Sequence, residues 1–409
     1  MSISNLLKVY SCLSLGLLLS CDGNNQETNS DTQFSTEVSA IALDMSAISS
    51  AAAIGDAYIR RIDLDFNAAG AAIDAFADEV ARFLATPDES SLQQVRESWI
   101  TANTAYEQIT LHRYFAESAL EDTQALQLFQ LDYRLNHWPI LPGYVDYVSN
   151  YPDSGIVNDM TVILESGYLR SQHGAFDINE VSIGFHVLEF LLWGENIDSE
   201  SPRPATDFLV QRELSAQQQA DGMNVVDLAN NRRRELLQLL TTLLDEDFEN
   251  LASTWSASST GYRPVSTASA VQTLQYMLDG IIGLLREEIL ANSLYLMLNG
   301  EFGESRPSPF SDSSQNAVSA QLSSLELLLL ETRQQEGGSL DQLLNSLSAD
   351  YQEFFLQNLD ASKECLVILF TSASRQEMTT AETEFRVVEC INSLTNMIDY
   401  LERVLPGNA

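Results

Sequence analysis

His186 and Glu189 are the two residues of this chain whose types and spacing most directly suggest metal chemistry. They lie three residues apart in the segment GFHVLE, so on a helix their side chains would be neighbours on one face. An imidazole and a carboxylate at this spacing can share a metal ion, and helical bundles hold carboxylate-bridged iron with the reverse order, Glu-x-x-His. Gly184 would let a ligand or another backbone segment approach closely. The alternative interpretation is a buried histidine that is simply hydrogen-bonded to the glutamate.

The elements that position this pair are predicted to be helices. The 409 residues include only 19 Gly and 10 Pro, and leucine runs such as LLQLLTTLL are too continuous for exposed helix faces. The sequence TPDE at 86–89 predicts a helix start capped by Thr86, and DINE at 177–180 resembles a capping box before the helix of His186. We find no sustained two-residue alternation flanked by hairpin turns, so sheet is not expected.

We predict an all-α fold of two tandem helical-bundle domains. Residues 194–205 are polar and contain two prolines, and they separate two helical stretches that are each long enough for a bundle. The predicted N-terminal domain, residues 39–198, carries the His186 motif. The predicted C-terminal domain comprises residues 199–409.

The first forty residues predict export and a lipid anchor. In residues 1–20 one cation, Lys8, precedes an apolar stretch too short to span a bilayer, which is typical of a signal peptide. This stretch ends in LLLSC and is similar to the bacterial lipobox, so Cys21 is the predicted lipidation site and residues 21–38 the predicted tether. The protein is therefore expected on the cell envelope, at the periplasmic face or the outer membrane.

Two cysteines remain for a disulfide. Cys12 lies in the predicted signal peptide and Cys21 is assigned to the lipid, which leaves Cys365 and Cys390. Both lie in predicted C-terminal helices joined by a short turn, and an exported compartment permits disulfides. We therefore predict a bridge between Cys365 and Cys390.

The charge of the chain argues against some partners. It has 58 acidic and 21 basic residues, a formal net charge of −37, which repels phosphate backbones and disfavours nucleic acid as a partner. Anionic membrane surfaces repel it as well, so membrane contact is expected through the lipid of Cys21. The run RRR at 232–234 is interpreted as a solvated helix stripe rather than an anion site. We expect the protein to be a monomer.

Several segments of the chain together resemble one known family. GFHVLEFLLWG is similar to the GxHxxE signature of imelysin-like proteins, also classed as the M75 peptidase family. Further segments resemble the family in the same order along the chain: Trp99 with YEQ at 106–108, LD at 131–132 with HWP at 137–139, RPATDF at 203–208, RRRELL at 232–237, and Glu304 with SPFSD at 308–312. The resemblance covers residues 40–405.

The resemblance implies an all-helical fold of two bundle-like domains with a site near their interface. It also implies an exported protein, often a lipoprotein, that is linked to bacterial iron uptake, so components of an iron-transport system are the expected partners. The founding imelysin was described as a protease. Arg203, Asp207, Ser311 and Asp312 match family segments and are candidates to face the His186 region. Alternatively, Asp207 and Asp312 cap helices and Arg203 pairs locally.

The predicted metal site combines the motif with two further acids. Hard cations such as ferric iron favour carboxylate oxygen with at most one or two imidazoles, so His186, Glu189 and Asp132, with Glu107, would suit iron or zinc. The chain departs from the family at Thr110, where a second acid is usual after the Tyr-Glu-Gln segment, and Glu107 is a candidate substitute. It departs again after the PFSD segment, where SSQN replaces N-T-H-x-D.

A metallopeptidase is less well supported by the residues. A zinc peptidase needs three protein ligands, an open position and a general base. Among the four histidines no two form HxxxH or HxH. The leading hypothesis is an exported, lipid-anchored protein of iron uptake that binds a metal cation or an iron-containing ligand near the GxHxxE motif, at the domain interface. The alternatives are an M75-type metallopeptidase and a non-catalytic periplasmic or surface interaction module.

Overall fold

The computed structural model describes residues 45–120, 122–195, 202–255, 268–301, 303–334, 338–374 and 378–404. In these ranges the regular structure is helical and there is no β-strand, only one isolated bridge between Val148 and Tyr151. The all-α prediction is therefore confirmed. The predicted signal peptide, the tether and Cys21 lie outside the described residues.

The helices fall into an earlier and a later group along the chain. The earlier group is α2 (Met45–Ala85), α3 (Glu89–Gln108), α4 (Thr110–Ala119), α5 (Asp122–Asn136), α6 (Pro142–Val145), α7 (Ser166–Gln172), α8 (Phe185–Trp193), η1 (Ala205–Phe208), α9 (Ala216–Ala220), η2 (Val225–Asp227) and α10 (Ala229–Thr254). The later group is α12 (Ala270–Gly283), the π-helix η3 (Leu284–Leu294), α13 (Tyr295–Leu298), α14 (Ser314–Arg333), α15 (Leu340–Leu347), the π-helix η4 (Gln352–Leu356), α16 (Gln357–Ser374) and α17 (Thr380–Val404).

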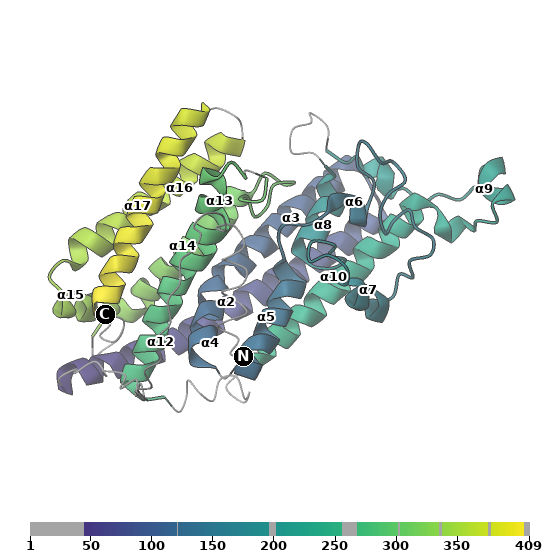
Figure 1. Ribbon diagram of the computed structural model, residues 1–409. Coiled ribbons are helices and arrows are strands. Elements are labelled where there is room, and N and C mark those ends of the chain that lie inside the picture. The colour runs from purple at the N-terminus through teal and green to yellow at the C-terminus, as the bar shows by residue number, and fades with distance from the viewer. Residues whose placement is uncertain are drawn as a thin grey trace, which may run out of the picture.

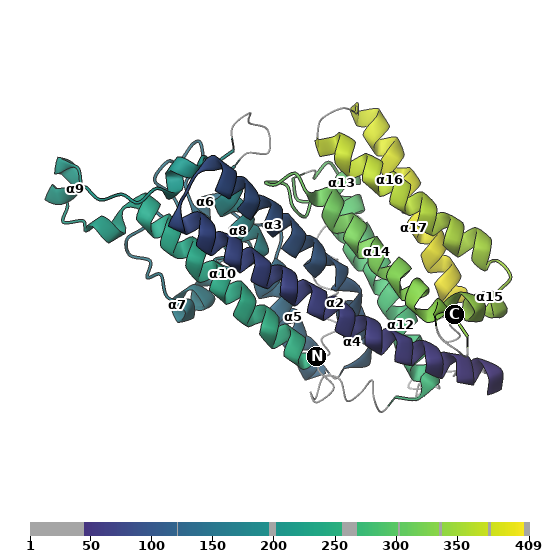
Figure 2. The ribbon, with the colours of Figure 1, turned by 180° about the vertical axis from the view of Figure 1, so that it is seen from behind.

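The long helix α2 contacts helices of both the earlier and the later group (Figure 1). It packs against α3 and α10 of the earlier group and against α12, α14 and α15 of the later group. In Figures 1 and 2, α8 and α10 lie towards one end and α16 and α17 towards the other. Buried hydrophobic side chains from both groups form one cluster. The division into domains at residues 198 and 199 stays a prediction.

The start of α3 differs from the sequence expectation. Asp88, not Thr86, is the N-cap: its carboxylate accepts a hydrogen bond from the Ser91 backbone N–H at 2.8 Å, and Ser91 Oγ accepts one from the Asp88 N–H at 3.1 Å. The Thr86 prediction is wrong because a serine three residues after Asp88 completes the reciprocal capping box. Glu89 is then free to accept a hydrogen bond from the backbone N–H of Ala205, 2.8 Å away.

α8 begins at a glycine whose conformation only glycine adopts readily. Gly184 is the N-cap with φ of 103°, and a Cβ built there would lie 2.5 Å from the carbonyl oxygen of Arg134 and 2.8 Å from that of Leu135. All nine residues of α8 are buried. The predicted capping box at 177–180 is wrong, because Glu180 N–H donates to the Asp177 carbonyl in a turn and the helix starts five residues later.

α16 and α17 are joined covalently near the C-terminal end of the described chain. Cys365 and Cys390 form a disulfide with their Cα atoms 5.6 Å apart. The pair lies on two helices that pack against each other, so the bridge links neighbouring elements. Among the helices that the structure describes, none is both long enough and apolar enough to cross a membrane.

Candidate functional site

His186 lies in the first turn of α8 and is almost completely enclosed, with 1% of its surface exposed. The rings of Trp138 and Trp99 meet the imidazole edge to face, with centroids 5.2 and 6.5 Å from its centre. Nδ1 of His186 lies 3.0 Å from Oε2 of Glu189. Nε2 is buried and has no hydrogen-bond partner among the described residues.

Glu189 is held from two directions. Its Oε2 faces His186, and its Oε1 accepts hydrogen bonds from the backbone N–H and the hydroxyl of Ser311, at 2.8 and 2.7 Å. Ser311 lies in the loop that precedes α14, so this contact joins the motif helix to the later part of the chain. A carboxylate can only accept, so the hydrogen between Glu189 and His186 sits on Nδ1. In the neutral tautomer with hydrogen on Nδ1, Nε2 presents a lone pair.

Glu107, on α3, is buried and already bonded to two amide groups. Asn136 Nδ2 donates to its Oε1 at 2.7 Å, and Gln321 Nε2 donates to its Oε2 at 2.8 Å. Burial raises the pKa of Glu107, and the charge of Glu288 raises it further, whereas the two amide donors and His186 lower it. Each oxygen of Glu107 therefore already accepts a hydrogen bond from a neutral amide.

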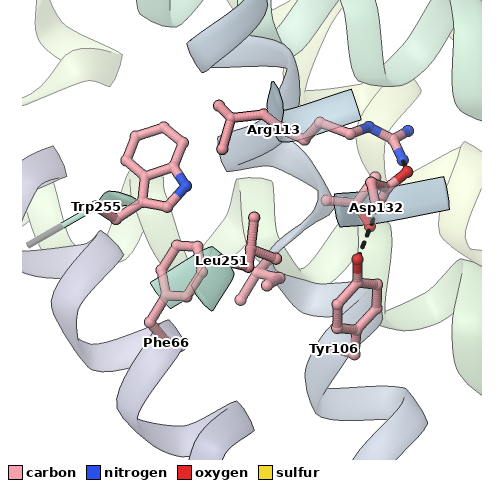
Figure 3. Close-up of a pocket in the computed structure, with 9 residues that line it drawn as sticks. Phe66, Tyr106, Arg113, Asp132, Leu251 and Trp255 are labelled. Atoms are coloured by element: carbon pink, nitrogen blue, oxygen red, sulfur yellow. Dashed lines mark hydrogen bonds and ion pairs between the residues drawn. The ribbon is translucent and has the colours of Figure 1, made fainter. Parts of the chain in front are cut away.

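Asp132, on α5, lies at the wall of a pocket and is linked to Glu107 only indirectly, through Arg113, Glu288 and Gln321 (Figure 3). It accepts a hydrogen bond from the Tyr106 hydroxyl at 2.7 Å and forms an ion pair with Arg113, which also pairs with Glu288. Aromatic and aliphatic side chains complete the lining: Phe66, Ile109, Leu128, Leu251 and Trp255, together with Thr110. Asp132 is therefore paired with an arginine from α4 that it shares with Glu288.

The structure brings together only part of the predicted metal site. His186, Glu189 and Ser311 are in contact, whereas Asp132 and Glu107 have other partners. Within the described ranges no group of three or more His, Cys, Asp or Glu side chains is arranged to hold a metal ion. The four predicted ligands thus do not form one coordination set in this conformation.

Arg203 and Asp207 belong to a second buried cluster. Arg203 Nη1 pairs with Asp146 at 2.9 Å and with Asp207 at 3.2 Å, and its guanidinium lies 4.5 Å from the centre of the Tyr147 ring. Arg233 approaches the same Asp146 carboxylate from the other side, with Nε 2.6 Å from Oδ2. Arg203 also contacts the motif helix: its guanidinium lies 5.8 Å from the centre of the Phe190 ring, and its backbone N–H donates to the Trp193 carbonyl at 2.8 Å. The cluster therefore adjoins the C-terminal half of α8.

The interpretation of the run 232–234 as a solvated stripe is wrong. Arg232 and Arg233 are buried, and Arg232 donates to four carbonyl oxygens of the loop 156–162. A loop without regular structure leaves carbonyl groups that need donors, and a buried guanidinium supplies several at once. Asp312, in contrast, is exposed, and its backbone has φ of 55°.

Known proteins resemble this chain in sequence and in fold. The Imelysin (Peptidase M75) family model matches residues 65–401. The chain belongs to the imelysin family. A putative iron-regulated protein A precursor from Parabacteroides distasonis ATCC 8503 shares the fold: the two chains are 15% identical, the TM-score is 0.60, and the match covers 90% of this chain and 97% of the other.

A second solved structure is also similar. It is an imelysin-like protein from Psychrobacter arcticum 273-4, with 14% identity, a TM-score of 0.47, and coverage of 88% of this chain and 95% of that one. No curated protein matches the chain. The family match includes the Gly184 cap, the His186 imidazole and the Glu189 carboxylate described above, since these residues lie within 65–401.

Sequence reasoning missed several side chains around the imelysin signature. Asn136 and Gln321 bind Glu107, and Ser313 lies 2.6 Å from the Ser311 hydroxyl. Neutral amides and hydroxyls carry no spacing signal, because the same residue types are common on exposed helix faces. Only the position of Ser313 beside the SPFSD segment at 308–312 offered a clue.

Proposed function

We propose that this imelysin-family chain is an exported, lipid-anchored protein of the bacterial cell envelope that takes part in iron uptake and binds an iron-containing ligand through His186. Export and lipid attachment are supported by the leader at residues 1–20 and by Cys21. The role in iron uptake is supported by family membership and by the similar structure, which is described as a putative iron-regulated protein A precursor.

One observation carries the binding part of the proposal: Nε2 of His186 is buried and unpaired among the described residues, while Nδ1 faces Glu189. Histidines that bind metals usually donate their other ring N–H to a carboxylate or carbonyl, which fixes the tautomer and the ring orientation. A buried polar atom without a partner costs about 1–3 kcal/mol. A ligand that offers a metal or a hydrogen-bond donor to Nε2 would remove this cost.

The donor set fits iron as cargo rather than as a resident ion. The oxygens of Glu189 and Glu107 already accept hydrogen bonds from Ser311, Asn136 and Gln321. Among the described residues no three His, Cys, Asp or Glu side chains are arranged to hold a bare ion. His186 would instead supply one nitrogen to iron that arrives with a chelating ligand. Because His186 is only 1% exposed, this binding requires side chains around it to move.

Binding of ferric citrate to the purified protein, measured by isothermal titration calorimetry, tests the proposal. We expect His186→Ala to weaken binding by at least about tenfold, since one coordinating nitrogen is lost. His137→Ala is the matched control. It removes another histidine, which is half-buried and whose Nε2 already has a hydrogen-bond partner, the side-chain oxygen of Asn179. Absence of binding by the wild-type protein, or equal affinity of the wild type and His186→Ala, would overturn the binding proposal.

The anchor has its own test. Cys21→Ser should move the protein from the membrane fraction to the soluble fraction of the cell envelope and abolish the mass increase due to lipid. If the wild-type protein carries no lipid on Cys21, this part of the proposal fails and the ligand proposal is unaffected. Peptidase activity stays a prediction from the family resemblance alone.

A further inference from the structure

The contact between α8 and the loop that precedes α14 gives a role to a residue outside the GxHxxE motif. We infer that Ser311 is a positioning residue of the His186 site: it orients the Glu189 carboxylate and thereby fixes which imidazole nitrogen carries the hydrogen. This inference rests on the proposed function, because it concerns the availability of Nε2 to a ligand. Ser311 bonds to Glu189 and not to Nε2 of His186, the nitrogen proposed to bind the ligand.

The hydrogen bonds around Glu189 allow one consistent assignment. The Ser311 N–H and hydroxyl both donate to Oε1, at 2.8 and 2.7 Å, so the Ser311 oxygen accepts from the Ser313 hydroxyl 2.6 Å away. His186 Nδ1–H is then the donor to Oε2. In this tautomer Nε2 carries the lone pair, and it has no hydrogen-bond partner among the described residues.

The backbone of the loop is shaped to present Ser311 in this way. Asp312, the next residue, has φ of 55°, and among the described residues it is the one non-glycine with positive φ. This left-handed conformation is costly for most side chains and tolerable for Asp. Ser313 N–H closes the turn by donating to the Ser308 carbonyl at 3.1 Å. The turn beside the buried Ser311 contact therefore uses a residue type that suits its backbone conformation.

Aromatic packing fixes the same loop against α8. The Phe310 ring lies 5.1 Å from Phe190 of α8 and 5.7 Å from Trp138, measured between ring centroids. Trp138 in turn packs against His186 and donates its indole N–H to the Glu304 carbonyl at 2.8 Å. Two chains of contacts therefore connect the loop to the imidazole. One runs from Ser311 through Glu189, and the other from Phe310 through the ring of Trp138.

The geometry predicts a tautomeric switch in one variant. In Glu189→Gln, the side-chain oxygen would stay with Ser311, because the backbone N–H of Ser311 can only donate and cannot face an NH₂ group. The amide NH₂ would then face His186 Nδ1 and force the hydrogen onto Nε2. That tautomer has no lone pair at Nε2, so a metal could not bind there.

The test combines ¹⁵N NMR of labelled histidine with ferric citrate titration, applied to the wild-type protein, Ser311→Ala, Glu189→Gln and a control. The control is Ser324→Ala, a buried serine whose hydroxyl bonds only to the carbonyl of Gln321 in its own helix. We expect hydrogen on His186 Nδ1 in the wild type and in Ser324→Ala. We expect Nε2–H in Glu189→Gln, a reduced Nδ1–H population in Ser311→Ala, and about 10–100-fold weaker iron binding in both site variants.

Two results would overturn the positioning role: hydrogen on Nε2 of His186 in the wild type, or identical tautomer and affinity in Ser311→Ala and Ser324→Ala. The NMR spectrum reports the tautomer of His186 without any ligand, so the positioning role can be tested even if the protein binds no iron. A wild-type protein that binds no iron but whose tautomer responds to Ser311→Ala supports the positioning role and overturns only the iron-binding proposal.

Discussion

Substitution of Gly184 by alanine tests the reasoning about the start of α8 most directly. Two costs add at this position. The backbone has φ of 103° and ψ of 179°, a region that is nearly exclusive to glycine and costs other residues about 1–3 kcal/mol. The new Cβ would also lie 2.5 and 2.8 Å from the carbonyl oxygens of Arg134 and Leu135, and overpacking of this kind costs about 1–3 kcal/mol.

We therefore expect Gly184→Ala to lower the free energy of unfolding by about 4 kcal/mol, the middle of the summed range. Urea denaturation followed by far-UV circular dichroism measures this value. Two glycine controls separate the contributions. Gly300→Ala has φ of 84° but no atom within 4 Å of the new Cβ, so only the backbone cost of about 1–2 kcal/mol applies. Gly167→Ala, in helix α7 and also without near atoms, should stay within about 1 kcal/mol of the wild type.

The order of the three variants in free energy of unfolding shows whether the contact with α5 contributes to the cost at Gly184. If Gly184→Ala loses no more stability than Gly300→Ala, the close approach to the carbonyl oxygens of α5 contributes nothing to the free energy of unfolding. The argument from overpacking at Gly184 is then refuted. A folded Gly184→Ala protein gives a second readout, because the displaced first turn of α8 would separate His186 from Glu189. Ferric citrate binding should then fall together with stability, whereas both glycine controls should retain it.

Three further predictions concern other parts of the chain. Arg233→Met should lower the free energy of unfolding by about 1–3 kcal/mol in urea. It removes one of the two guanidinium groups that contact the fully buried Asp146 carboxylate, Arg203 remains paired with it, and Arg233→Lys should recover only part of the loss. Burial lowers the pKa of His173 to about 4 from its usual 6.5, so the unfolded chain binds more protons between these values. Stability should therefore fall as the pH is lowered from 6.5 to 4, and His173→Gln should flatten this dependence; an unchanged pH profile would contradict the assignment. Replacing both Cys365 and Cys390 by alanine opens a loop with a sequence separation of 25 and should cost about 3.5 kcal/mol, and equal urea midpoints for the variant and the wild type would argue against the bridge.

The helical character of the chain could be predicted from its sequence, but the ends of the helices could not always be placed. Leucine-rich runs and scarce Gly and Pro indicate buried helices, and these are present. The start of α8 was misplaced because a turn at 177–180 uses the same residue types as a capping box. What decides the true start is the contact of Gly184 with α5, and a contact between distant segments leaves no local pattern in the sequence.

The candidate site could be predicted only where its residues are close in the chain. The spacing of His186 and Glu189 places them on one face of a helix, and they are hydrogen-bonded. The roles of Glu107 and Asp132 depend on partners far along the chain: Gln321 for the first and Arg113, itself shared with Glu288, for the second. A carboxylate that is neutralised by a distant partner looks the same in the sequence as a free metal ligand.

The length of α2 has a practical consequence for dissecting this protein. Its 41 residues correspond to about 60 Å of α-helix, and α12, α14 and α15 pack against it although they follow it by more than 180 residues. A fragment that begins at residue 199 would lack α2, against which α12, α14 and α15 pack. A fragment that ends at residue 198 would expose that face of α2 to water. Each half would therefore be prone to aggregate when expressed alone. Co-expression of the two fragments, followed by co-purification, should recover the fold by complementation.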